Sequence, residues 1–102
     1  MPTVANLSIA AKAAEGEAFE IELEIGAPYC TETGEWACPV GLQGLYDDLP
    51  DVRGEDSFQA LCLAIGLAQK LLQDFVDEGG TLSVDGDRFP LESYAFGAAR
   101  RG

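Results

Sequence analysis

The sequence contains no histidine, and this absence removes the most common general base and the most common metal ligand of proteins. It has only three cysteines, Cys30, Cys38 and Cys62, and they form no Cys-x-x-Cys pair, which disfavours a disulfide framework and a zinc site. No apolar run reaches about 18 residues and no basic region precedes an early apolar run, so we expect neither a membrane span nor a signal peptide. The chain is therefore predicted to be cytoplasmic, without a metal or a cofactor.

Basic residues are also scarce. The sequence has six Lys and Arg residues and 18 Asp and Glu residues, and its formal net charge is −12. Such a surface repels phosphate backbones and anionic lipids, so we expect no direct binding to nucleic acid and no membrane association. It attracts basic proteins, although solubility alone also explains an acidic composition.

The chain has 102 residues, of which 47% are hydrophobic, enough for one core in one domain. We expect a single domain over 1–102, with its core in 3–91 and a flexible tail over 92–102.

Alternating apolar and polar residues predict strands over 3–11 and 17–25. The clearest alternation places Phe19, Ile21, Leu23 and Ile25 on a buried face. Glu20, Glu22 and Glu24 then face water. An ordinary solvated sheet face, without any binding function, also explains this row. A third strand is predicted over 36–46, at an edge or with a bulge because Pro39 cannot donate to a ladder, and a fourth over 81–84 before an Asp85-Gly86 hairpin turn.

A helix is predicted over 56–78, capped by Asp56 and Gln59 and ended by Gly79-Gly80. Gly66 within it suggests the close approach of a neighbouring backbone. The helix is too apolar for one sheet, so either the 45–52 segment or a second copy covers it, and we predict a homodimer.

The predicted fold is α+β: an antiparallel β-sheet of about four strands packed on one long α-helix, in the order β-β-β-α-β. A hairpin centred near Gly34 would place Cys30 opposite Cys38, and two reduced thiols are the alternative to a redox pair there.

The 47–56 connection holds several carboxylates and is predicted to be a loop. It lacks the spacing of a calcium-binding loop. Paired carboxylates can perform acid–base chemistry, but this requires a dry cleft. A serine or cysteine nucleophile would lack its histidine, and no phosphate-binding glycine motif is present.

The segment Gly54-Glu55-Asp56-Ser57-Phe58-Gln59-Ala60-Leu61 opens this helix after a predicted strand that carries Trp36, Cys38 and Pro39. This Gly-x-Asp-Ser-x-Gln-Ala-Leu pattern, followed by Phe89-Pro90, resembles an uncharacterised family of small bacterial proteins over about residues 17–91. The resemblance implies a β-rich first half, one long helix and a bacterial, cytosolic protein, and it carries over no catalytic residue.

We therefore expect a small acidic, non-catalytic protein-binding module, such as an immunity-type or regulatory inhibitor of a basic protein partner. The alternatives are a nucleic-acid mimic that blocks a nucleic-acid-binding complex, which needs two rows of carboxylates, and an enzyme that uses carboxylates alone. The predicted partner-binding residues are Glu20, Glu22, Glu24, Asp47, Asp48 and Asp51.

Overall fold

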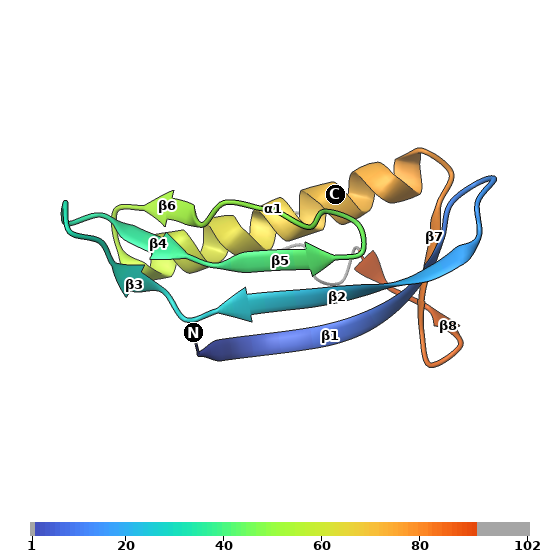
Figure 1. Cartoon of the computed structure of the whole chain (residues 1–102), viewed down its shortest axis with the longest axis horizontal. Helices are drawn as coiled ribbons and strands as arrows, with labels where there is room; N and C mark the ends of the chain where they lie inside the picture. The colour runs from blue at the N-terminus through green and yellow to red at the C-terminus, as the bar shows by residue number, and fades with distance from the viewer. Residues whose placement is uncertain (1, 92–102) are drawn as a thin grey trace, which may run out of the picture.

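The computed structural model of the chain describes residues 2–91 (Figure 1). The predicted tail over 92–102 lies outside these residues. The elements in chain order are β1 (Thr3–Lys12), β2 (Ala18–Gly26), β3 (Tyr29–Cys30), β4 (Trp36–Cys38), β5 (Val40–Gln43), β6 (Val52–Gly54), α1 (Ser57–Asp77), β7 (Thr81–Val84) and β8 (Asp87–Arg88). No helix in this part of the chain is long and apolar enough to cross a membrane.

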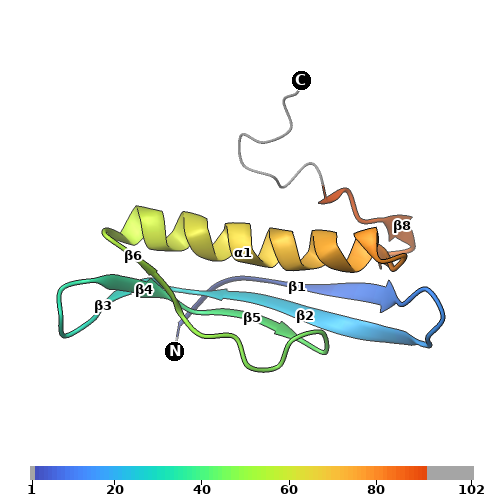
Figure 2. The same ribbon diagram turned by 90° about the horizontal axis from the view of Figure 1, so that it is seen from above.

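The strands form two antiparallel sheets and the helix covers one side of them (Figure 2). The larger sheet has five strands in the order β5-β2-β1-β7-β8, and the smaller has three in the order β3-β4-β6. Helix α1 packs against β4, β5 and β6 and also contacts β2 and β7. The α+β class is confirmed, whereas the prediction of one sheet with about four strands was wrong.

The long β1–β2 hairpin supplies much of the core. Its register pairs Ile9 with Ile21, and both side chains are fully buried. Phe19, also on the inner face, meets Phe75 of α1 edge to face at 5.8 Å between ring centroids. The predicted cause of the alternation of apolar and polar residues in 17–25 is confirmed, because the apolar face of β2 packs toward the helix.

Pro39 divides the predicted third strand into two. Before it, β4 pairs with β3 and β6, and after it β5 pairs with β2 at the edge of the larger sheet. The carbonyl oxygen of Pro39 accepts a hydrogen bond from the Gly26 N–H at 2.9 Å. The missing N–H of proline therefore ends one ladder and lets the chain change sheets.

The predicted loop over 47–56 contains a short strand, β6, so this prediction was wrong for Val52–Gly54. β6 pairs with β4 and lies against the start of α1. Gly54 makes this contact possible, since a Cβ there would lie 2.6 Å from the backbone nitrogen of Ala60. The expected close approach at Gly66 was wrong, because an added Cβ would meet nothing within 4 Å.

The predicted helix caps are confirmed. The Asp56 carboxylate accepts from the Gln59 N–H at 2.7 Å, and the Gln59 side chain accepts from the Glu55 N–H at 2.6 Å. At the other end, the N–H groups of Gly79 and Gly80 donate to Val76 and Phe75, with Gly79 at φ +101°.

The β3–β4 hairpin has a different register from the predicted one. Cys30 faces Trp36, so the pairing is centred on Thr33 and Cys38 lies opposite Val52 of β6. Cys38 is fully buried and its thiol donates to the Gly26 carbonyl oxygen at 3.3 Å, whereas Cys30 is exposed. The predicted Cys30–Cys38 juxtaposition was wrong.

Part of the apolar surface of α1 stays uncovered within residues 2–91. Phe58 is 66% exposed, Leu63 48% and Ile65 39%. The segment between β5 and β6 follows the β5 edge on the side of the sheet away from α1 (Figure 2). Leu45, Leu49 and Val52 of the 45–52 segment still pack against the core, but the segment leaves these helix residues uncovered, so the prediction that it covers the helix holds only in part.

Candidate functional site

The outer face of β2 carries the predicted row of acids. Glu20, Glu22 and Glu24, here called the acidic row, are all exposed on the face opposite α1. Side chains along a strand alternate between its two faces. Because Ile21 and Ile25 are buried on the face toward the helix, the three glutamates lie on the other face. The acidic row is thus a direct consequence of packing one side of the strand.

Neutral donors on β1 hold two of these carboxylates in place. The Ser8 hydroxyl lies 2.8 and 2.7 Å from the two oxygens of Glu22, and Thr3 donates to Glu24. Each donor comes from the neighbouring strand on the same face. These bonds restrict the two side chains without neutralising their charge.

Three aspartates of the β5–β6 connection, Asp47, Asp48 and Asp51, are here called the acidic loop. Asp47 accepts a hydrogen bond from the Gly44 N–H at 3.1 Å, and Asp51 accepts one from the Tyr29 hydroxyl at 2.5 Å. Gly44, at φ +101°, starts the loop against β2, where a Cβ would overlap the backbone oxygen of Glu20. The loop is therefore tied at both ends to the sheets.

The structure brings four of the six predicted residues around one depression. It has a volume of about 210 Å³ beside the β5 edge, and its acidic lining residues are Glu24, Asp47, Asp48 and Asp51. Glu20 and Glu22 do not line it but continue the acidic row along β2. The predicted residues therefore form one continuous acidic surface on the side of the sheet away from α1.

The ion pairs of Arg53 and Lys70 do not involve this surface. Arg53 pairs with Glu35 at 2.9 Å, and Lys70 pairs with Asp74 on the helix at 3.3 Å. Across residues 2–91, none of the six predicted carboxylates forms an ion pair. In the same range, no group of three His, Cys, Asp or Glu side chains is placed to hold a metal ion.

Tyr29 is a part of this site that the sequence reasoning missed. Its bond to Asp51 raises the pKa of the phenol, because ionisation would break the bond and put two negative charges side by side. Tyr29 is 45% exposed at the rim of the acidic loop. No sequence signal links residues 29 and 51, since the contact depends on how the two sheets meet.

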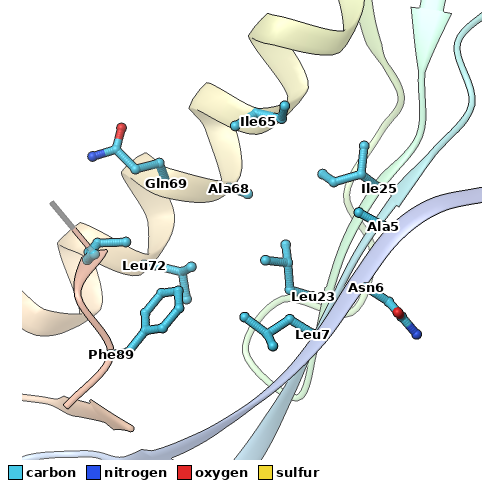
Figure 3. A pocket seen from close by; sticks show the side chains of 11 residues that line it. Ala5, Asn6, Leu7, Leu23, Ile25, Ile65, Ala68, Gln69, Leu72 and Phe89 are labelled. Carbon is cyan, nitrogen blue, oxygen red and sulfur yellow. The ribbon is translucent and has the colours of Figure 1, made fainter. Parts of the chain in front are cut away.

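A second hollow, here called the apolar groove, was not predicted. It has a volume of about 390 Å³ between the inner face of the β1–β2 hairpin and the helix (Figure 3). Leu7 and Leu23 form its floor, Ile65 and Leu72 form the helix wall, and Phe89 closes one end. None of its lining residues is charged.

Comparison with known proteins gives a family but no activity. The family model described as "Domain of unknown function (DUF6968)" matches residues 9–95, which is most of the chain. No curated protein and no solved structure matches. The expectation of an uncharacterised family, drawn from Gly54 to Leu61, is confirmed to that extent. The chain belongs to the DUF6968 family of domains of unknown function.

Proposed function

We propose that this protein is a non-catalytic binding module that meets a basic protein through the acidic row and the acidic loop. Its role would be that of an immunity-type or regulatory inhibitor, which occupies a cationic surface of its partner. The observation that carries the proposal is the un-neutralised acidic surface: four of its six carboxylates accept hydrogen bonds from neutral donors. Charge held in a fixed arrangement favours fast and selective association with a complementary surface.

The depression beside β5 suits recognition better than acid–base catalysis. Glu24, Asp47, Asp48 and Asp51 line a small hollow whose acids are exposed to water. Carboxylates that act as acid and base need environments that separate their pKa values, usually by excluding water. An arginine or lysine side chain of a partner would fit beside several of these oxygens at once.

Nucleic-acid mimicry is the weaker alternative. A mimic requires two rows of negative charge, and the residues of β1 and β5 that pair with the acidic row are all uncharged. These neighbours are Asn6, Ser8 and Ala10 on β1 and Gly41 and Gln43 on β5. The single row therefore supports a protein partner.

The compartment is part of the same proposal. We infer a bacterial, cytosolic protein, as the resemblance of the Gly54–Leu61 segment implies. Cys30, Cys38 and Cys62 are all free thiols, which suits a reducing compartment.

The test is affinity capture at low ionic strength with three baits. The first is the native chain, the second has Glu20, Glu22 and Glu24 changed to Gln, and the control has Glu15, Glu32 and Glu78 changed to Gln. Both variants lose the same charge, but the control lies outside the acidic surface. We expect a basic protein to be retained by the native and control baits and lost from the acidic-row variant. Equal retention by all three baits, or capture only of proteins that DNA displaces, would contradict the proposal.

A further inference from the structure

The edge of β1 is open over most of its length. On one side β1 pairs with β2 throughout, but on the other side β7 pairs only with Ala10–Lys12. Within the described part of the chain, nothing pairs with that side of Thr3–Ile9. About 23 Å of strand is therefore unpaired, at roughly 3.3 Å per residue.

This edge lacks the usual protection against further pairing. Natural edge strands are short or carry a lysine, a proline or an inward-pointing charge in the exposed part. Thr3–Ile9 contains no charged residue and no proline, and Lys12 lies in the part that β7 already covers. One register irregularity, between Thr3 and Ala5, lies at the far end. The segment can accept another strand along its length.

The apolar groove borders the same edge. Ala5 and Leu7 belong to the open strand and also line the groove, whose opposite wall contains Ile65 (Figure 3). Phe58, 66% exposed, lies two helical turns before Ile65 on the same side of α1. An unpaired strand edge and an uncovered apolar surface therefore meet along one side of the molecule.

We propose that this side binds a second copy of the chain, through antiparallel pairing of β1 with β1 of the partner copy. A two-fold axis normal to the sheet, near Asn6, would join the two five-stranded sheets and leave both helices on one face. Each groove would then lie against the groove of the other copy. The contact is isologous, because the same edge and the same apolar wall serve both molecules.

Charge makes this the side on which two copies repel each other least. A chain of net charge −12 repels itself over most of its surface, but the lining of the groove and the Thr3–Ile9 strand carry no charge. In the paired sheet the two acidic rows would stand three strand spacings apart, or about 14 Å. This exceeds the Debye length of about 8 Å at physiological salt, so repulsion between the rows is largely screened.

The test measures the mass of the full chain in solution by sedimentation across a concentration series, with reductant present to keep exposed Cys30 reduced. Native protein is compared with Ala5→Asp and with the control Ala10→Asp. Both alanines are exposed on β1, but Ala5 faces the groove on the open segment and Ala10 lies beside β7. We expect native protein and Ala10→Asp to dimerise, and Ala5→Asp to raise the dissociation constant at least about 100-fold, because pairing would bury an unpaired charge in each copy.

Thermal unfolding of each dilute variant checks that the monomer still folds. A native chain that stays monomeric throughout the series overturns the proposal. If that monomer dimerises when Phe96→Ser is introduced, the groove is covered by the chain's own residues 92–102 instead. A native dimer that Ala5→Asp leaves intact also overturns it, since the copies would then meet elsewhere. Because no partner protein is present, none of these results bears on the acidic surface.

Discussion

The hydroxyl of Tyr29 donates to the Oδ2 atom of Asp51 at 2.5 Å, and this bond joins the start of β3 to the acidic loop. The two residues come from segments that are separated by the whole β4–β5 stretch. The bond fixes Asp51, the last aspartate of the loop, whereas Arg53 two residues later has its ion pair with Glu35. It therefore links the position of the acidic loop to the protonation of one phenol.

The first prediction concerns the titration of Tyr29. Its pKa is raised above the ordinary value of 10.0, with the hydrogen bond to Asp51 as the largest cause. A group whose pKa is raised on folding stabilises the fold below the unfolded pKa and loses that contribution as the pH rises through the folded pKa. The contribution of this bond should thus be complete at neutral pH and disappear above about pH 10.

Labelled-tyrosine NMR, with Tyr29→Phe for assignment, measures this pKa directly. Asp51→Asn removes the neighbouring charge and should bring the pKa of Tyr29 back toward its ordinary value. A native Tyr29 that titrates at or below that value would show that the bond is not formed in solution.

The second prediction concerns Gly54 and Gly66, which differ in the space around their Cα atoms. Gly54→Ala should reduce the free energy of unfolding by about 2–3 kcal/mol, since the new Cβ collides with the backbone of Ala60. Gly66→Ala should increase it by up to about 1 kcal/mol, because the site is open and alanine favours the helix. Urea unfolding measures both changes. Equal effects of the two substitutions would disprove the close packing of β6 on α1.

The third prediction concerns thiol reactivity. Burial raises the pKa of the Cys38 thiol, and no solvent reaches the side chain, so Cys38 should resist alkylation in the folded protein. Exposed Cys30 should react readily. Peptide mass mapping after brief iodoacetamide treatment, with and without denaturant, distinguishes them. Rapid labelling of Cys38 in the native state, or a Cys30–Cys38 disulfide under mild oxidation, would be inconsistent with the observed register.

Local sequence patterns were sufficient to predict the elements whose structure depends on residues close together in the sequence. The alternation from Phe19 to Ile25 gives β2 its two faces, and the Asp56 and Gln59 side chains cap α1 through contacts four residues apart or fewer. At Asp85 and Gly86 the positive φ angles of 54° and 86° confirm the predicted hairpin turn.

Features that depend on partners distant in sequence could not be predicted in the same way. β6 is too short to show a period, and only its pairing with β4 and its packing on α1 make it a strand. The one-residue error in the Cys30 hairpin followed from assuming that the turn was centred on its glycine, Gly34. The close approach expected at Gly66 occurs at Gly54, because sequence alone does not tell which glycine has a neighbour.

For the candidate site, the sequence correctly predicted an exposed acidic row and a separate group of loop aspartates. It did not predict that Glu24 and the acidic loop share one depression, because that depends on β5 returning beside β2. The apolar groove was missed for a similar reason. Its walls come from the hairpin, the helix and the residues around Phe89.

The proposed function requires the acidic row to bind a basic partner through its charge. The most direct measurement is the dissociation constant of the captured partner as a function of salt concentration, for the native chain and for Glu20, Glu22 and Glu24→Lys. We predict that native affinity falls steeply as salt rises, and that the variant binds far more weakly with a much flatter dependence. Native and variant affinities that coincide at every salt concentration would contradict the proposed function.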